Sequence, residues 1–384
     1  MKKIDTYIKY NLFLLFILYE SQGLFYESGS IISRSFLAVI MLICGIYMVK
    51  TFTLPKKEGF YKAWTAFTFL NVIGFFFTGR LSDRYQFSMF KETLVFLLSF
   101  YPFYYFAAKK QLEIKDFLIF FMIMMPLAIG QFYYSKTLLI ISGRFSSYED
   151  IVNNAAYKFV LLFPFVFLIR KQKLLSAGFA SLILFFIIAG SKRGAVVVGS
   201  VILLWYFYYQ MKIIDEKNKW KGYFLNFLSI AAVSFLGYRY FLNNAYLQYR
   251  LKLAAYGDTS ARNLIFLNIW DTWLDSDPFH LLFGYGFAAS IRLSKLGSFA
   301  HNDWLEILSN FGLIGVIILA ALFYQGFKLC FNREWNSDKR ILMAAIITSA
   351  FAITLFSMWY TSLRSYLNAM LLAYLIGNKE KTNI

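Results

Sequence analysis

Residues 301–327 read HNDWLEILSNFGLIGVIILAALFYQGF, two polar side chains followed by a mostly apolar stretch. The apolar part is long enough to cross a bilayer, because a spanning helix needs about 20 residues. We therefore predict a membrane-spanning helix over 303–327, with His301 and Asn302 at the border between water and lipid. The chain has only two histidines, and one of them lies at this border. Histidine is the side chain that best exchanges protons near neutral pH.

The composition of the chain is typical of an α-helical membrane protein. Of the 384 residues, 59% are hydrophobic and only 16% are charged, whereas a soluble domain carries roughly 25% charged residues. Backbone polar groups in lipid must be satisfied internally, and the apolar runs are too continuous for the alternating strands of a barrel. We predict an all-α, polytopic membrane protein that forms one domain, residues 1–384. Twelve spanning helices are expected at about 8–26, 33–53, 60–78, 89–108, 116–134, 155–170, 174–190, 194–212, 222–242, 303–327, 341–360 and 364–377.

The lysines indicate how these helices are oriented. The first residues, MKKIDTYIKYNLFLLF, resemble a signal sequence, but no Ala-x-Ala site follows, so we expect an uncleaved first helix. With twelve spans the lysine clusters share one compartment, which the positive-inside rule makes cytoplasmic, and both termini lie there. Topology thus explains the net charge of +18 better than nucleic-acid binding does. The lysines concerned are Lys2, Lys3, Lys50, Lys56, Lys57, Lys109, Lys110, Lys115, Lys171, Lys173, Lys212, Lys217, Lys219, Lys221, Lys328, Lys339, Lys379 and Lys381.

Arginines follow the opposite pattern. Ten of the thirteen fall at or near the predicted outer side: Arg34, Arg80, Arg84, Arg144, Arg193, Arg239, Arg250, Arg262, Arg292 and Arg364. A guanidinium stays charged when it is desolvated and its fork of donors suits phosphate or carboxylate. These arginines indicate an anionic ligand on the outer face, although several are also expected to pair with Asp83, Glu149, Asp150 or Asp258.

The longest connection is the outer loop at 243–302, and an ordered loop of this length is usually functional. Its segment 259–278 predicts an amphipathic helix. Asn268, Asp271, Thr272 and Asp275 form the polar face, and Ile265, Phe266, Ile269 and Trp273 the apolar face. Arg262 falls on the apolar face, where burial without an anion is costly, unless the helix start frays and leaves Arg262 in solvent. The following FGYGF at 283–287 predicts a flexible turn, and His280, beside Pro278, is expected to be structural.

Two arrangements are open for His301. If the helix includes it, His301, Leu308, Gly312 and Gly315 share one face, and the glycines let a neighbouring helix come close. If Asp303 and Glu306 form an N-cap pair, His301 lies just before the helix. In both cases the positive end of the helix dipole disfavours protonation and keeps a neutral base available.

The sequence GSKRGA at 190–195 places Arg193 at the outer end of a span. The small neighbours Gly190 and Gly194 are expected to leave room for a headgroup. The other interpretation is an ordinary snorkelling arginine, whose charged end reaches water along an apolar stem.

The order of these elements resembles the O-antigen ligase and O-antigen polymerase (Wzy) superfamily of bacterial membrane glycosyltransferases. The resemblance is carried by a small-Ser-x-Arg stretch with Arg193, Arg262 early in the long outer loop, Pro278 with a Gly-x-Gly turn, and then His-Asn-x9-Gly-x-x-Gly at 301–315. It covers roughly 185–320 and departs at Lys192, where many members have a small or polar residue. It implies a GT-C-like fold in the bacterial inner membrane, with the long loop 243–302 between spans 9 and 10 in the periplasm.

The resemblance also implies a substrate and a mechanism. The donor is a glycan on undecaprenyl pyrophosphate, and no nucleotide sugar, cofactor, metal or nucleic acid is required. His301 is expected to be the general base, with Arg193 and Arg262 as catalytic residues that hold the pyrophosphate. Membrane lipid and a chain-length regulator protein are the further partners. Asn302, Arg250 and Arg292 are expected to bind substrate.

Four functions remain open. We favour a polymerase, because the outer loop is compact and no additional soluble domain is present. An O-antigen ligase, which transfers the glycan to lipid A-core, uses the same chemistry. A polysaccharide flippase or transporter fits the twelve spans, but transporters usually show internal repeats and ionisable groups near the middle of the membrane. A non-catalytic assembly partner would tolerate loss of His301.

Overall fold

The computed structural model describes residues 2–55, 58–79, 82–142, 152–169, 172–213 and 262–378, together with scattered positions between 220 and 252. The described residues are almost entirely helical and form no named strand, only an isolated bridge between Gln22 and Tyr26. The elements are α1 (Lys2–Glu20), α2 (Ile31–Thr51), α3 (Gly59–Thr78), α4 (Arg84–Ala108), α5 (Ile114–Ile141), α6 (Ala156–Leu162), the 3-10 helix η1 (Phe163–Leu168), α7 (Lys173–Ala189), α8 (Arg193–Ile213), α11 (Arg262–Leu274), α12 (Pro278–Phe283), α13 (Ala289–Leu293), α14 (Asp303–Cys330), α15 (Ser337–Phe356), the 3-10 helix η3 (Leu363–Ser365) and α16 (Tyr366–Gly377).

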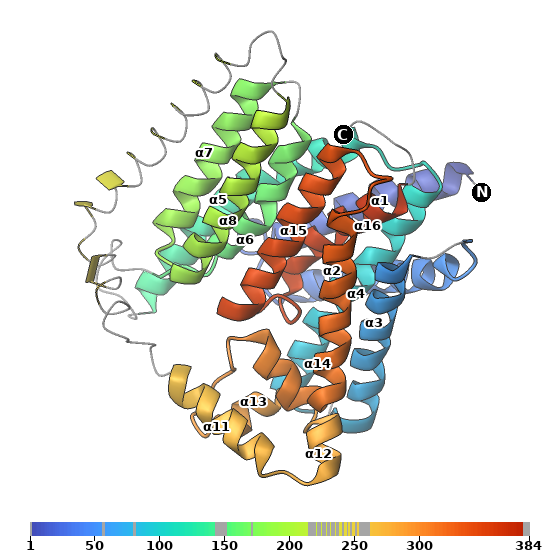
Figure 1. Ribbon diagram of the computed structural model, residues 1–384, viewed down its shortest axis with the longest axis vertical. Coiled ribbons are helices and arrows are strands. Elements are labelled where there is room, and N and C mark those ends of the chain that lie inside the picture. Colours follow the sequence, from blue (N-terminus) through green and yellow to red (C-terminus); the bar gives the residue numbers. More distant parts are fainter. Residues whose placement is uncertain are drawn as a thin grey trace.

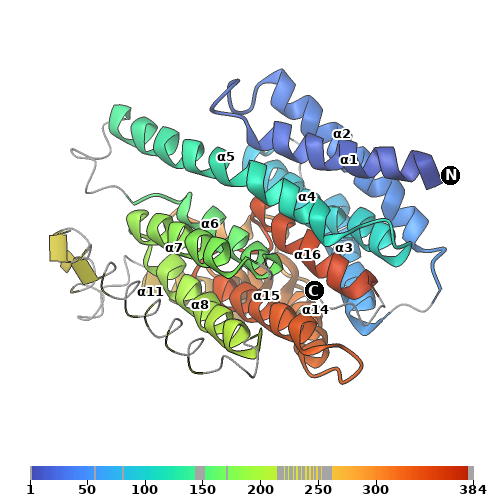
Figure 2. The ribbon, with the colours of Figure 1, turned by 90° about the horizontal axis from the view of Figure 1, so that it is seen from above.

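The centre of the bundle is built on α4 and α16. Seen from above, they lie between α1 and α2 on one side and α7 and α8 on the other (Figure 2). α14 packs against α3 and α15, and α15 packs against α8. The short helices α11, α12 and α13 gather at one end of the bundle, where α14 begins (Figure 1).

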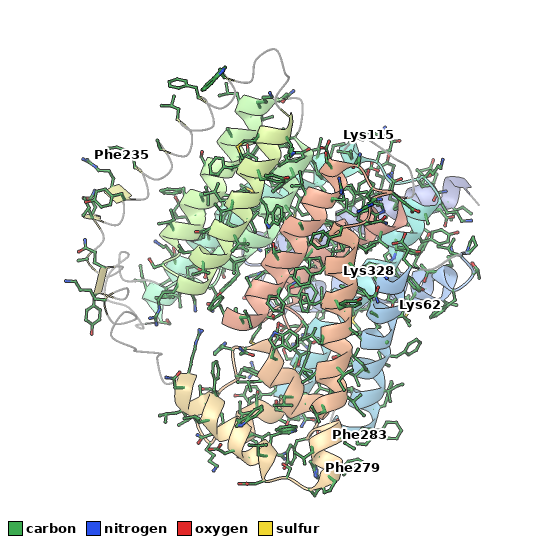
Figure 3. The ribbon with its side chains drawn as sticks, in the orientation of Figure 1. Lys62, Lys115, Phe235, Phe279, Phe283 and Lys328 are labelled. Carbon is green, nitrogen blue, oxygen red and sulfur yellow. The ribbon has the colours of Figure 1, made fainter. Side chains whose placement is uncertain are left out.

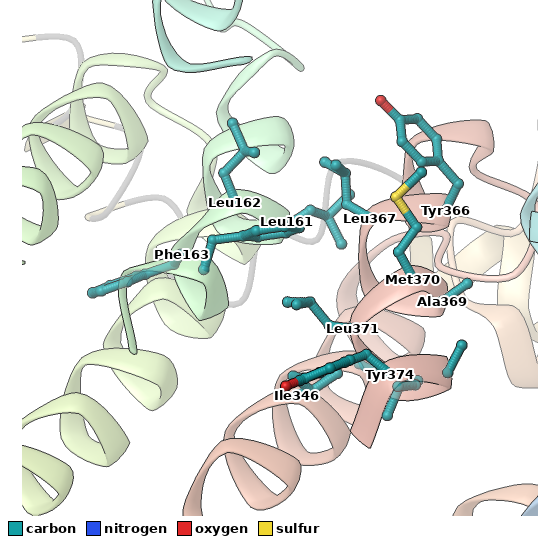
Figure 4. Close-up of a cluster of buried hydrophobic side chains, with 14 of the residues drawn as sticks. Leu161, Leu162, Phe163, Ile346, Tyr366, Leu367, Ala369, Met370, Leu371 and Tyr374 are labelled. Atoms are coloured by element: carbon teal, nitrogen blue, oxygen red, sulfur yellow. The ribbon is translucent and has the colours of Figure 1, made fainter. Parts of the chain in front are cut away.

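The core follows from helices that are apolar on every side, which is the pattern of a fully buried helix. Every residue of α16 is buried, and so is the second half of α4, from Val95 to Ala107. Figure 4 shows Leu161 of α6 facing Leu367 and Leu371 of α16. The candidate site lies beside this core, at the starts of α4 and α6 and just after the end of α15.

Among the residues that the structure describes, five helices are long and apolar enough to cross a membrane: α2, α5, α8, α14 and α15. The all-α prediction is confirmed for the described residues, and several predicted spans match helices within a few residues. The first predicted span, 8–26, differs because α1 already ends at Glu20. The span at 155–170 is a 7-residue α-helix continued by a 6-residue 3-10 helix. The last span is reduced to the 12 residues of α16, fewer than the ~20 that cross a bilayer unaided.

The predicted span 222–242 lies largely outside the described residues, so the number of spans stays a prediction. The orientation of the chain is likewise a prediction. Figure 3 shows Lys62, Lys115 and Lys328 away from the end of the bundle that carries Phe279 and Phe283 of α12. These three lysines are therefore separated from the short helices of the long loop.

Candidate active site at the converging helix starts

A cavity of about 370 Å³ lies where several helices begin. Tyr85 and Ser88 are in the first turns of α4, Lys192 immediately precedes α8, Arg262 opens α11, and His301 lies just before α14. Helix N-termini carry positive partial charge, so their convergence favours an anion. The described residues that line it are Tyr85, Ser88, Met89, Glu92, Asn154, Tyr157, Leu161, Lys192, Arg262, Phe299, His301, Ser357, Met358, Thr361, Ser362 and Arg364.

His301 is fixed by the residues on either side of it. It has a positive φ of 51°, a conformation that costs an L-residue roughly 1–2 kcal/mol. The Ala300 N–H donates to Glu306 Oε2 (3.2 Å), and Asn302 is the N-cap of α14, accepting from the N–H groups of Trp304 (3.0 Å) and Leu305 (3.1 Å). His301 lines the cavity. The arrangement with His301 before the helix is therefore correct, but Asn302, not Asp303, is the cap.

Two buried carboxylates of α14 hold the walls of the cavity. Asp303 Oδ2 accepts from the N–H groups of Trp359 (2.5 Å) and Tyr360 (3.1 Å), which fixes the turn after α15. Glu306 accepts from Ser290 Oγ (2.7 Å) in addition to Ala300. Each carboxylate thus receives two hydrogen bonds, which offset part of the cost of its burial.

The glycine pair of α14 works differently from the prediction. Gly312 has φ 59° and ψ −156° and kinks the helix. The turn after α12 packs into this kink, where Gly286 N donates to Asn310 O (3.0 Å). A Cβ on Gly312 would lie 2.5 Å from the carbonyl carbon of Leu282, and one on Gly284 2.5 Å from the backbone of Asn310. Gly312 thus accommodates the end of α12 and the turn after it, whereas a Cβ on Gly315 would meet Phe311 and Ile307 of its own helix. The 283–287 segment is docked on α14 through backbone hydrogen bonds from Tyr285 and Gly286.

Arg262 is held at the cavity from the start of α11. The apolar face of α11 is buried as predicted, with Ile265, Ile269 and Trp273 inside. The Arg262 side chain donates from Nη1 to the carbonyl oxygen of Phe356 (3.2 Å), at the end of α15. This contact orients the guanidinium while leaving its other donors beside His301 in the same cavity.

Lys192, rather than Arg193, lines the cavity. Arg193 is the first residue of α8, one step further along the chain. The predicted space for a headgroup beside it is filled by protein: a Cβ on Gly194 would lie 2.3 Å from Tyr157 Oη, and one on Gly190 2.6 Å from Ala156 Cβ. That expectation was wrong, because Gly190 lets the end of α7 pack closely on α6 and Gly194 does the same for α8.

The charges around the cavity favour a neutral imidazole. Lys192, Arg262 and Arg364 are cationic, and Glu92 is the carboxylate among the described lining residues. Burial among the cavity walls, and then the positive charges of Arg262 and Lys192, lower the pKa of His301 below its usual value. A histidine with a lowered pKa is unprotonated at neutral pH and is able to accept a proton.

The other predicted residues are not brought into this cavity. Asn302 is occupied as the helix cap and donates from Nδ2 to Leu355 O (3.2 Å). Arg292 lies on α13 with its guanidinium 5.7 Å from the centre of the Tyr285 ring. Arg250 lies outside the described residues. His280 lies in α12 beside Asp277, away from the cavity lining.

The cavity also contains residues that the sequence patterns did not single out for a role. Glu92 and Tyr157 carried no signal, and Arg364 was one of ten arginines without distinction. Lys192 was visible only as a departure from the family pattern. In the part of the chain that the structure describes, no group of three or more His, Cys, Asp or Glu side chains is placed to hold a metal ion.

Residues 177–320 match a family model, Wzy_C, described as O-Antigen ligase. No curated protein matches the chain. The match spans the predicted stretch of resemblance, 185–320, and confirms that this region resembles the O-antigen polymerase and ligase superfamily. Together with the apolar helices, it points to an integral membrane protein.

Proposed function

We propose that the protein is a membrane glycosyltransferase that joins lipid-linked oligosaccharide repeat units into an O-antigen or other surface polysaccharide. The single observation that carries this proposal is the shared cavity of His301, Arg262 and Lys192. It combines a neutral base with cations at converging helix N-termini. Such a site suits an acceptor hydroxyl beside a leaving group that becomes more negative as it departs.

The donor is a glycan carried on undecaprenyl pyrophosphate. Arg262 and Lys192 hold the pyrophosphate, and Arg193 adds positive charge from the adjacent first residue of α8. These cations carry the charge-neutralising role that a metal fills in other transferases, so we expect transfer to persist in the presence of EDTA. The support is electrostatic, since guanidinium and phosphate oxygens match as donors and acceptors.

The transfer needs one proton acceptor. A sugar hydroxyl of a second lipid-linked unit attacks the anomeric carbon of the donor, while the bond from that carbon to the pyrophosphate oxygen breaks. The hydroxyl proton passes to His301, and undecaprenyl pyrophosphate leaves with the electron pair of the broken bond. Because Glu306 and Asn302 anchor the residues on either side of His301, the imidazole is held in place before substrate arrives.

We place this chemistry at the periplasmic face of the bacterial inner membrane, with both termini in the cytoplasm. The support is the lysine distribution of the sequence and the lining of the cavity, which includes Arg262 at the start of α11 in the long loop. A chain-length regulator protein is the expected partner of a polymerase.

An O-antigen ligase is the second candidate function, because the matching family model carries that description. The two functions share donor, base and cations and differ in the acceptor, which is lipid A-core for the ligase.

The test is a deletion strain, complemented with wild-type protein or a His301→Ala variant. Lipid A-core that carries a single repeat indicates a lost polymerase, and bare core with accumulated lipid-linked polymer indicates a lost ligase. In parallel, purified protein in nanodiscs is given the lipid-linked repeat units, and chain extension is scored on a gel. A normal lipopolysaccharide ladder in the deletion strain would exclude both functions.

A further inference from the structure

A second cavity adjoins the first. It has a volume of about 420 Å³, within the ~300–1,000 Å³ usual for ligand pockets. Glu92, Ser362 and Arg364 line both cavities, so the two meet at these side chains. Of the residues that the structure describes, those lining the second cavity are Tyr19, Glu20, Gln22, Ser28, Glu92, Gln131, Tyr134, Ser135, Leu138, Ser362, Leu363 and Arg364.

The polar side chains of the second cavity are held by a buried network. Lys158 Nζ lies 2.5 Å from Glu20 Oε2 and 2.5 Å from Gln131 Oε1, and Gln131 Nε2 donates to the carbonyl oxygen of Glu20. Gln22 Oε1 accepts from Ser33 Oγ (2.8 Å). A wall whose side chains are already oriented loses less freedom when a ligand binds.

The two cavities differ in charge. The first has three cations and one carboxylate, whereas the second has the carboxylates of Glu20 and Glu92 and the guanidinium of Arg364. The lysine beneath it, Lys158, is paired with Glu20. The second cavity is therefore poorly suited to a pyrophosphate and better suited to an uncharged ligand with many hydroxyl groups.

The side-chain types fit a sugar. Carboxylate, amide and hydroxyl groups from Glu20, Gln22 and Ser135 supply acceptors and donors for ring hydroxyls. Tyr19 and Tyr134 supply aromatic faces with a polar end, which suit the apolar faces of a pyranose. Among the residues that the structure describes, Arg364 forms no side-chain hydrogen bond, which leaves its donors for a ligand at the junction.

We propose that the second cavity binds the acceptor oligosaccharide, so that its terminal hydroxyl passes Arg364 and Glu92 and reaches His301 in the first cavity. This inference rests on the proposed glycosyl transfer and assigns the two substrates to two cavities. The donor pyrophosphate occupies the first cavity, with its three cations, and the acceptor sugars occupy the second cavity beside it.

The test compares two neighbouring tyrosines of α5. Both side chains are exposed, but Tyr134 lines the second cavity, whereas Tyr133 lines neither cavity. The probe is the repeat-unit oligosaccharide released by mild acid from the lipid-linked intermediates of the source strain. Its binding to purified protein is measured by ligand-observed NMR, and extension kinetics are measured at saturating donor. Tyr134→Ala is expected to weaken binding and raise the acceptor KM about tenfold, with kcat and donor binding little changed, whereas Tyr133→Ala matches the wild type.

The outcomes separate this inference from the proposed function. Normal extension and oligosaccharide binding by Tyr134→Ala, in a preparation where Arg262→Ala strongly lowers extension, would overturn the acceptor site and leave the transferase standing. If the wild-type protein extends no chain but binds the oligosaccharide, and Tyr134→Ala loses that binding, the sugar site is kept and the transferase is refuted. Tyr134→Phe, which keeps the ring, provides a second reading if Tyr134→Ala does not fold, and it is expected to bind within about threefold of the wild type.

Discussion

The two histidines of this chain both lie near the start of a helix but in different chemical surroundings. His280 lies in the first turn of α12, whose N-cap Asp277 accepts from the N–H groups of Phe279 and His280 and also pairs with the His280 ring. The His280 ring stacks on Tyr285 with centroids 4.2 Å apart. His301 lies immediately before α14, next to its N-cap Asn302, and its ring faces a cavity with cations.

The difference teaches that the neighbouring charge decides the role of a histidine at a helix start. The His280 hydrogen bond is the largest cause that lowers the pKa of Asp277, so these two side chains satisfy each other. At His301 the capping residue is an uncharged amide, and the nearby carboxylates Asp303 and Glu306 are directed to backbone N–H groups. The imidazole is left facing Arg262 and Lys192, which disfavour its protonation.

The largest expected effect comes from exchanging each histidine for alanine. We expect His301→Ala to lower chain extension by about 10² or more, which is the usual contribution of a general base, while binding of the lipid-linked donor persists. His280→Ala is expected to change extension little, since its ring contacts Asp277 and Tyr285 outside the cavity. Extension and donor binding are measured on purified protein in nanodiscs. Equal activity of the two variants would remove the distinction between the histidines.

The next effect concerns the cation nearest the base. Arg262→Ala is expected to lower extension roughly 10- to 100-fold, the loss that corresponds to one hydrogen bond to a charged group. Arg262→Lys is expected to recover little, because a point charge does not reproduce the guanidinium fork. The matched control is Arg292→Ala, since Arg292 is exposed beside Tyr285. Loss of activity in the control alone would show that the anion binds outside the cavity.

A smaller effect tests how the two histidine regions are joined. An alanine at Gly312 would keep the positive φ of 59° and place its Cβ against the Leu282 backbone, so we expect the variant to lose about 3 kcal/mol or more. Gly297 has a φ of 65° but nothing within 4 Å, so Gly297→Ala is expected to lose only about 1 kcal/mol. Thermal unfolding in detergent measures both. If Gly312→Ala and Gly297→Ala lost similar amounts of stability, the docking of the turn at 284–286 would not depend on the kink at Gly312.

The sequence predicted best those features that depend on a single helix or loop segment. The apolar runs predicted most helices, and the periodicity of 259–278 predicted the buried face of α11 with Ile265, Ile269 and Trp273. His301 and Arg262 were singled out by type and position, and the structure brings them to one cavity. Each of these predictions depends on spacing within a single stretch of chain.

The rest depends on how helices pack against one another. Glu92 and Arg364 reach the cavity because the first half of α4 and the turn after α15 lie side by side in the bundle. No local sequence pattern encodes this arrangement. One residue along a helix turns a side chain by about 100°, so spacing alone did not show that Lys192 rather than Arg193 faces the cavity. The kink at Gly312 follows from docking of the turn after α12, and a helical repeat alone does not predict it.

The smallest effect concerns the pH dependence that separates His301 from an ordinary histidine. The neutral imidazole is the active base, so extension falls as pH drops through the pKa of His301, and this pKa is lowered by burial and by Arg262 and Lys192. Activity should therefore persist somewhat below the pH at which an unperturbed histidine becomes charged, about 6.5. Lys192→Gln removes one positive neighbour, raises the pKa of His301 and moves the acidic limb of the profile to higher pH.

The control is Lys328→Gln, at the last turn of α14. It leaves the profile unchanged, because charges beyond about 10 Å are screened at ordinary salt. A profile of kcat/KM from pH 5 to 8 measures the shift, and movement to lower pH in Lys192→Gln would contradict the assignment of His301 as the base.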